Sequence, residues 1–136
     1  MRAVLDPNVV ISGLISRGGA PARVLLGWRN GHFEAIVSPL LLEELRRALA
    51  YPKLRRHVPP EAADAAVRWL SEGATHAPDP ADSPPVHSAD PGDDYLIALA
   101  AREGAALVSG DKHLLELAGR IPVYSPRDFL DLVQTG

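Results

Sequence analysis

MRAVLDPNVV, residues 1–10, places a short apolar run directly before an acidic residue and a proline. The run Met1–Leu5 is too short for a typical helix and fits a buried strand. Asp6 followed by Pro7 is the usual arrangement of a helix N-cap and first helical residue, and it also puts a carboxylate just beyond the strand. A buried strand, an acidic residue and then a helix are the expected start of an α/β domain.

The same alternation of strands and helices continues along the chain. Further short apolar runs predict strands at residues 33–37, 105–108 and 121–124. Capped or amphipathic segments predict helices over residues 7–17, 21–29, 38–50, 60–73, 91–103, 114–117 and 126–133. Five prolines in residues 78–92 predict a loop, too short to separate two domains. We therefore expect one α/β domain over residues 1–136 with a mainly parallel central sheet.

The composition is that of an ordinary globular protein. Hydrophobic residues make up 46% and charged residues 23% of the 136, and one compact core fits that length. The absence of cysteine excludes a disulfide framework, a thiolate metal site and a cysteine nucleophile. No apolar run approaches the ~20 residues of a membrane span, and residues 1–10 lack an export signal, so we expect a cytoplasmic protein without a membrane partner.

The charge is distributed unevenly. A net charge of −3 argues against a protein that coats nucleic acid through general basicity. Residues 1–68 contain ten Lys and Arg against six Asp and Glu, which gives +4. Residues 69–136 contain four against eleven, which gives −7. The asymmetry either reflects solubility alone or separates cations that approach a substrate from an acidic site.

Two acids, Asp6 and Asp111, each stand just beyond a predicted strand. In open α/β sheets the carboxyl ends of the strands form the edge at which ligands bind. A functional role is therefore expected for both residues. The competing interpretation is that each carboxylate only caps the helix that follows it.

The helix over residues 38–50 offers a pair of neighbouring glutamates. At roughly 100° per residue, Glu44 borders the apolar stripe of this helix, whereas Glu43 points more nearly to solvent. Glu44 is thus the better candidate for chemistry and Glu43 the alternate. A solvated acidic pair balanced by Arg46 and Arg47 is the competing interpretation.

The helix over residues 91–103 separates its acids more sharply. Asp93 lies about 40° from the centre of the apolar stripe, whereas Asp94 lies about 140° away. A carboxylate on the apolar side of a helix is costly unless it is paired, protonated or metal-bound, which favours Asp93. Asp94 and Asp90 are the alternates, and the competing interpretation is that Asp90 and Asp93 only stabilise the helix start.

A cluster of Asp6, Glu44, Asp93 and Asp111 would repel itself, because no complementary lysine or arginine is evident near these acids. Mutual repulsion raises the pKa of each carboxyl group, and a divalent cation removes that penalty. Oxygen ligands without cysteine or a histidine motif favour Mg²⁺ or Mn²⁺ over Zn²⁺. If the four acids converge, we expect them to bind Mg²⁺ or Mn²⁺.

Four ordered segments give the chain a family resemblance. VLDPNVVISGL, VSPLLLEELRRAL, DPGDDYLIALA and LVSGDKHLL resemble the PIN-domain ribonucleases, and in particular the PIN toxins of bacterial and archaeal type II toxin–antitoxin systems. The resemblance runs in order across almost the whole chain. It implies a PIN-like three-layer α/β/α fold and a metal-dependent endoribonuclease that hydrolyses RNA phosphodiester bonds.

The acidic positions of the family fall on Asp6, Glu44, Asp93 and Asp111, which the resemblance makes both metal ligands and catalytic residues. Asn8 matches a polar residue that would orient the first acid. Ser109 matches a small hydroxyl residue that would support the last acid through a hydrogen bond.

Two positions depart from the pattern that the resemblance carries. Pro7 stands where the family commonly has Thr or Ser, and His113 stands where an acidic residue is common. The resemblance further implies an RNA substrate, a homodimer and an antitoxin protein as a partner.

RNA needs cations at the rim of an acidic site. The basic residues favoured for this role lie in predicted loops or helix ends and are Arg17, Lys53, Arg55 and Arg56. Trp28 and Tyr95 are able to stack on bases, although residues at such helical positions more often belong to the core.

Two other functions compete with the nuclease. One is a receiver-like phosphoacceptor domain, but the chain lacks the acid pair after the first strand and the lysine after the last. The other alternative is a catalytically inactive PIN-like module that binds RNA or a partner.

Overall fold

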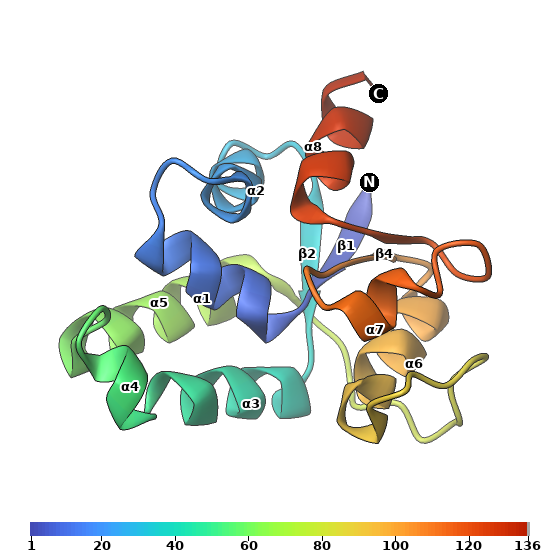
Figure 1. Cartoon of the computed structure of the whole chain (residues 1–136), viewed down its shortest axis with the longest axis horizontal. Coiled ribbons are helices and arrows are strands. Elements are labelled where there is room, and N and C mark those ends of the chain that lie inside the picture. Colours follow the sequence, from blue (N-terminus) through green and yellow to red (C-terminus); the bar gives the residue numbers. More distant parts are fainter. Residues whose placement is uncertain (136) are drawn as a thin grey trace.

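The computed structural model describes residues 1–135, so Gly136, the last residue of the predicted domain, lies outside the described range. At its centre is an all-parallel, five-stranded sheet in the order β3-β2-β1-β4-β5 (Figure 1). The strands are β1 (Arg2–Leu5), β2 (Glu34–Val37), β3 (Thr75–His76), β4 (Ala106–Val108) and β5 (Val123–Tyr124). The expected α/β class with a parallel sheet is confirmed.

Helices cover both faces of this sheet. Figure 1 shows α1, α2, α3 and α5 on one side and α6 and α7 on the other, with α8 beside α2, as a three-layer α/β/α fold requires. The helices are α1 (Pro7–Ile15), α2 (Ala20–Arg29), α3 (Pro39–Leu49), α4 (Pro52–Arg55), α5 (Pro60–Gly73), α6 (Asp94–Glu103), α7 (Lys112–Leu115) and α8 (Pro126–Thr135). A 3₁₀ turn, η1 (Pro91–Asp93), precedes α6.

Three local differences separate these elements from the sequence prediction. The strand β3 was not expected, because a two-residue edge strand has no apolar run to reveal it. The helix α4 occupies a stretch that was predicted as a loop, which places Lys53 and Arg55 within a helix. The first turn of the predicted 91–103 helix is 3₁₀ rather than α-helical, and α7 begins at Lys112, two residues earlier than expected.

The core lies where the helices meet the sheet. The strand β1 is central in the sheet, and Ala3, Val4 and Leu5 on it are almost completely buried. From the helices, Leu45 of α3 and Leu96 of α6 are fully buried. Burial on both faces explains why the strands are continuous apolar runs rather than alternating ones.

No single helix of the described chain is long and apolar enough to cross a membrane. The helices α1 and α2 reach the length and apolar composition of a membrane span only when they are taken together, and they are bent by 102° relative to one another. Both helices bury residues of the core, Val10 on α1 and Val24 on α2 among them.

Two glycines provide a test of how closely α1 and α2 approach. A Cβ atom added to Gly13 of α1 would lie 2.6 Å from Leu25 Cδ1 and 3.1 Å from the Pro21 carbonyl oxygen of α2. Overpacking of this kind is expected to make Gly13→Ala less stable by roughly 1–3 kcal/mol in urea unfolding. Gly27→Ala is the matched control, because its Cβ would find its nearest neighbour at 3.7 Å. It is expected to gain roughly 0.5–1 kcal/mol from helix propensity. Equal effects of the two substitutions would contradict the close approach.

Candidate functional site

Two acids from distant parts of the chain meet at the carboxyl edge of the sheet. The strands β1 and β4 pair directly, and the Asp6 N–H donates to the Val108 carbonyl oxygen at 2.9 Å just beyond the last strand residues. Next to this bond, the Ser109 hydroxyl donates to Asp6 Oδ2 at 2.7 Å. Asp6 is 2% exposed and Ser109 is fully buried. The strand pairing therefore fixes the first acid against the residues that follow β4.

Ser109 connects Asp6 to Asp111. Its hydroxyl oxygen accepts a hydrogen bond from the Asp111 N–H at 2.9 Å while its hydroxyl proton goes to Asp6. Asp6 Oδ1 accepts from the Asn8 N–H at 3.0 Å, so the contact from position 8 comes from its backbone. Asp111 Oδ1 accepts from the His113 N–H at 2.8 Å. Both acids thus cap the helices that follow them and face the same site.

Asp93 joins these two acids from the other side of the site. It ends the turn η1, and its Oδ2 atom is buried with no hydrogen-bond partner within residues 1–135. Burial raises the pKa of Asp93 to about 7, and a hydrogen bond with Asp111 and the charges of Asp6, Asp111 and Asp90 act in the same direction. Burial likewise raises the pKa of Asp6, against the hydrogen bonds from Asn8 and Ser109 that lower it. Asp6 and Asp93 therefore hold less negative charge than two free aspartates would.

Asp94, the neighbour of Asp93, is hydrogen-bonded to the preceding loop. Its Oδ1 accepts from the Ser88 N–H at 2.7 Å, and its Oδ2 lies 2.8 Å from His87 Nδ1. Desolvation opposes ionisation of Asp94, but the hydrogen bonds from His87 and Ser88 outweigh it and lower its pKa. Asp90 caps η1 through a 3.0 Å hydrogen bond from the Gly92 N–H. Asp94 therefore fastens the end of the predicted 78–92 loop to the start of α6, close to Asp93.

The two glutamates of α3 share one arginine. Arg47 lies 3.1 Å from Glu44 and 2.9 Å from Glu43, so the expectation that no cation stands near the acids was wrong for Glu44. Glu44 is the more buried of the two, at 39% exposure against 59%. The neighbouring charges that raise the pKa of Asp93 are those of Asp6, Asp111 and Asp90, and not that of Glu44. The structure therefore brings Asp6, Asp93 and Asp111 together, whereas Glu44 is paired with Arg47.

Tyr95 lies within reach of the charges of both Glu44 and the aspartates. Burial raises the pKa of its hydroxyl, and the charges of Glu44, Asp6 and Asp93 raise it further. The ring is partly buried and packs against the core. Sequence reasoning treated Tyr95 as a core or stacking residue and did not place it among the acids. Its position directly after the Asp93–Asp94 pair was the available signal.

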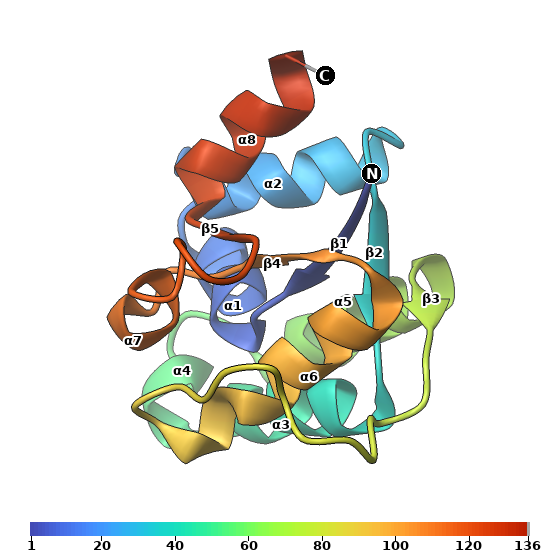
Figure 2. The same cartoon turned by 90° about the vertical axis from the view of Figure 1, so that its right-hand side faces the viewer.

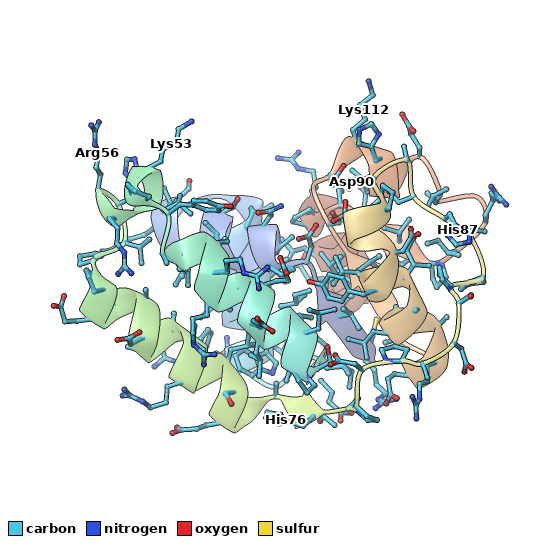
Figure 3. The ribbon with its side chains drawn as sticks, turned by 90° about the horizontal axis from the view of Figure 1, so that it is seen from below. Lys53, Arg56, His76, His87, Asp90 and Lys112 are labelled. Carbon is cyan, nitrogen blue, oxygen red and sulfur yellow. The ribbon has the colours of Figure 1, made fainter. Side chains whose placement is uncertain are left out.

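Figure 3 looks onto this edge of the sheet, with α3 on one side and α6 on the other. Lys53 and Arg56 extend outward beside α4, and Asp90 and Lys112 lie across the gap near α6 and α7. Arg17, in the turn between α1 and α2, is exposed. None of these cations forms an ion pair with another residue of the described range.

Comparison with known proteins identifies the family. Residues 2–113 match the PIN domain family. The chain belongs to the PIN domain family. PIN domains are generally nucleases, and the cluster of acids at the carboxyl edge lies within the matched residues of this PIN domain.

Solved structures with the same fold differ strongly in sequence. One is VapBC2 from Rickettsia felis, bound to a DNA fragment from its promoter, with 16% identity and a TM-score of 0.57 over 92% of this chain and 98% of that one. Another is a PilT N-terminus domain protein from the hyperthermophilic archaeon Sulfolobus solfataricus P2, with 14% identity and a TM-score of 0.53. That match covers 98% of this chain and 93% of the other. No curated protein matches the chain.

The acidic cluster of this PIN domain has features that suit a cation. Within residues 1–135 no group of three or more His, Cys, Asp or Glu side chains is placed so that it could hold a metal ion as it stands. Asp93 Oδ2, however, is a buried carboxylate oxygen without a partner, and such an atom is costly unless it gains a proton or a cation. The donors around it are oxygens of Asp6 and Asp111, which suit a hard divalent ion.

The raised pKa of Asp93 predicts how stability depends on pH. Its pKa is about 7 in the folded chain against 3.8 for the free group, so the folded state holds more protons between these values. The free energy of unfolding is therefore expected to fall as pH rises through this range and to level off above it. In urea unfolding with a chelator present, Asp93→Asn is expected to be more stable than wild type at pH 8, with a smaller gain at pH 5.

Asp94→Asn is the matched control for this test. Because the pKa of Asp94 is lowered in the folded chain, its ionised form stabilises the protein above its unfolded pKa, and this contribution is lost as pH falls. Asp94→Asn is therefore expected to lose stability at pH 8. A change of the same sign and size for both variants would contradict the assignment of opposite environments to the two neighbours.

Proposed function

We propose that this PIN domain is a metal-dependent endoribonuclease that hydrolyses RNA phosphodiester bonds. The observation that carries the proposal is the buried, unpartnered Oδ2 atom of Asp93 among the carboxyl groups of Asp6 and Asp111. Membership of a nuclease family supports it. A site of this kind requires a cation before a phosphodiester is able to approach, because three carboxylates alone repel it.

Asp6, Asp93 and Asp111 are the residues that would hold Mg²⁺ or Mn²⁺. When bound, such a cation supplies Lewis-acid polarisation of the scissile phosphate. Glu44 stands on α3 as the fourth acid, tied to Arg47 through a 3.1 Å contact. Displacing that arginine would free Glu44 to contribute a further oxygen.

The chain's own residues set the geometry and protonation of the acids. The Ser109 hydroxyl and the Asn8 N–H hold both oxygens of Asp6, which fixes its orientation before substrate arrives. Asp93, with a pKa of about 7 in the absence of a cation, would give up its proton when the cation binds, because a nearby positive charge favours the ionised carboxylate. The site thereby combines a fixed acid with one that changes its protonation state.

The proposed biological role is that of the toxin in a type II toxin–antitoxin system. The likeness in fold to VapBC2 and the acidic site within a PIN domain support this role. The proposed partners are an antitoxin protein that covers the acidic site, an RNA substrate and a second copy of the chain in a homodimer. The proposed location is the cytoplasm.

Cleavage assays test the proposed chemistry. With Mg²⁺ or Mn²⁺ and single-stranded or hairpin RNA, Asp6→Asn and Asp93→Asn are each expected to cut at least about 100-fold more slowly than wild type, because each removes a carboxylate from the cluster. Glu43→Gln is the matched control and is expected to cut at nearly the wild-type rate, since Glu43 is exposed and contacts only Arg47. If wild type cuts no RNA with either metal but still binds it, the catalytically inactive PIN-like module is the correct alternative.

Metal binding has a readout that does not depend on cleavage. Mn²⁺ or Mg²⁺ in the millimolar range is expected to raise the melting temperature of wild type at pH 8, because a ligand that binds only the folded state stabilises it. Asp93→Asn is expected to abolish this shift, whereas Asp94→Asn is expected to retain most of it. A shift of equal size in wild type and Asp93→Asn would place the cation away from the acidic cluster.

A further inference from the structure

Two cavities lie at the starts of α2 and α8, and the first of them reaches the acidic cluster. The first, of ≈ 360 Å³, begins at Asp111 and is lined by Asn8 and Ser12 of α1 together with Pro21 and Pro126. The second, of ≈ 340 Å³, is lined by residues 18–20, Arg23, Arg127, Leu130, Asp131 and Gln134. The linings of the two cavities are neighbours in the sequence. Pro21 and Pro126 line the first cavity, and the residues next to them in the chain, Ala20 and Arg127, line the second. The cavities therefore lie on either side of the same two helix starts.

Figure 2 shows how the helices that carry these residues are arranged. The first residues of α2 and α8 lie on the same side of the molecule as α7, and α8 runs alongside α2 from there. Asp111 caps α7 on one side of the first cavity. Pro21 and Pro126, at the starts of α2 and α8, line the same cavity. The first cavity therefore begins at Asp111, and the second shares with it the starts of α2 and α8.

The first cavity suits an uncharged group. Among its lining residues within the described range, Asp111 is the one that carries a charge. Pro21, Pro126 and Val9 provide apolar walls, and the side chains of Asn8 and Ser12 provide hydrogen-bonding groups. The volume is at the lower end of the range of small-ligand cavities, about 300–1,000 Å³. A sugar ring or a nucleobase fits this chemistry, whereas a phosphate would meet the Asp111 carboxylate.

The second cavity suits an anion. Arg23 on α2 and Arg127 on α8 both line it, and within residues 1–135 neither arginine forms an ion pair. Asp131 also lines it, so the charges of the lining residues sum to +1. Arginine side chains bind phosphate oxygens through paired N–H groups. From the acidic cluster outward, the lining residues are therefore first acidic, then uncharged in the rest of the first cavity, and then net positive in the second cavity.

We propose that these two cavities form a binding track for the RNA strand beside the scissile bond. The first cavity holds the nucleoside next to the scissile phosphate, with Asn8 and Ser12 as partners for its sugar or base. The second holds the next phosphate between Arg23 and Arg127. This inference rests on the proposed ribonuclease function, because it takes the scissile phosphate to lie at the acidic cluster.

The track differs from the cationic surface that the sequence favoured. Lys53 and Arg56 lie together at α4 and its end, on the other side of the view from Lys112 (Figure 3), and neither lines the two cavities. Arg23 and Arg127 are separated by more than one hundred residues, so no local cluster of basic residues marks them. A test of the track must therefore compare these two pairs of cations directly.

The decisive experiment changes both partners of the proposed phosphate contact. A short RNA substrate carries an uncharged methylphosphonate at the phosphate one nucleotide from the scissile bond, placed on the 5′ side in one substrate and the 3′ side in another. For wild type, one of the two is expected to raise KM about tenfold. In the double variant R23Q/R127Q, KM for the unmodified RNA is expected to rise similarly, and the methylphosphonate is expected to have no further effect.

A charge-matched control and a conservative variant accompany this test. R68Q/R120Q removes two exposed arginines that line neither cavity, and it is expected to keep the wild-type KM and the full methylphosphonate effect. R23K/R127K retains the positive charge and is expected to recover part of the affinity. If R23Q/R127Q fails to fold, as judged by circular dichroism, the single variants R23Q and R127Q and the lysine variant provide the same comparison.

Salt dependence gives a second, independent readout. Losing one phosphate contact to single-stranded RNA is expected to reduce the slope of log affinity against log salt by about 0.7. This reduction is expected for R23Q/R127Q and not for R68Q/R120Q, with binding measured on Asp93→Asn backgrounds so that RNA stays intact.

Failure of the track and failure of the proposed function are distinguishable. If wild type cleaves RNA but R23Q/R127Q retains the wild-type KM and methylphosphonate effect, the track is wrong and the ribonuclease stands. If K53Q/R56Q instead abolishes the effect, the strand runs along α4 and the track is likewise wrong. If wild type cleaves no RNA, the proposed function fails. If R23Q/R127Q then also binds RNA with the affinity and salt slope of wild type, the track is overturned as well.

Discussion

The direct pairing of β1 with β4 is the constraint on which the rest of the site depends. Leu5 lies opposite Val108 in this pairing, so Asp6 and Ser109 are the first residues beyond it on each strand. Parallel strands end at the same edge, and the two segments are therefore brought together across about one hundred residues of sequence. The Ser109 hydroxyl then connects Asp6 to the backbone of Asp111. A shift of this register by one residue would turn Asp6 to the other face of the sheet.

The same pairing creates an electrostatic problem that the site must solve locally. Burial disfavours the charged form of Asp6, and two hydrogen bonds oppose that effect. Asp93 has no such partner on Oδ2, and its pKa consequently rises further, to about 7. Asp94, one residue later, is satisfied by His87 and Ser88 and shifts the other way. The pKa values of these adjacent aspartates thus shift in opposite directions, because Asp93 belongs to the acidic cluster whereas Asp94 is hydrogen-bonded by the preceding loop.

Residues 1–10 and the later apolar runs were sufficient to predict an α/β class with a parallel sheet, since buried strands and capped helices are visible locally. Capping and function were treated as alternatives for Asp6 and Asp111, yet the structure shows each carboxylate capping a helix while facing the acidic cluster. The edge strand β3 was missed because two residues have no periodicity. The short helix α4 was missed because Pro52 reads equally well as a helix end.

The sequence could rank acids on one helix but could not measure distances between helices. Helical periodicity predicted that Glu44 is less exposed than Glu43, which the structure confirms. It could not show that Arg47 contacts both, or that the charges of Asp6 and Asp111 act on Asp93. The argument for Asp93 assumed an α-helical first turn, whereas η1 is 3₁₀. The preference for Asp93 over Asp94 as a site residue stays a prediction, and the structure adds that the preceding loop engages Asp94.

Charge along the sequence is a poor guide to charge in space. The first half of the chain is cationic and the second acidic, which suggested that the first half supplies the basic residues and the second the acids. The structure mixes the two halves: Asp6 from the cationic half joins Asp93 and Asp111, and Arg127 from the acidic half lies in one cavity with Arg23. Parallel sheets cause this mixing, since every crossover returns the chain to the same edge. The field that a phosphodiester meets is therefore set by the order of strands in the sheet rather than by the order of charges in the chain.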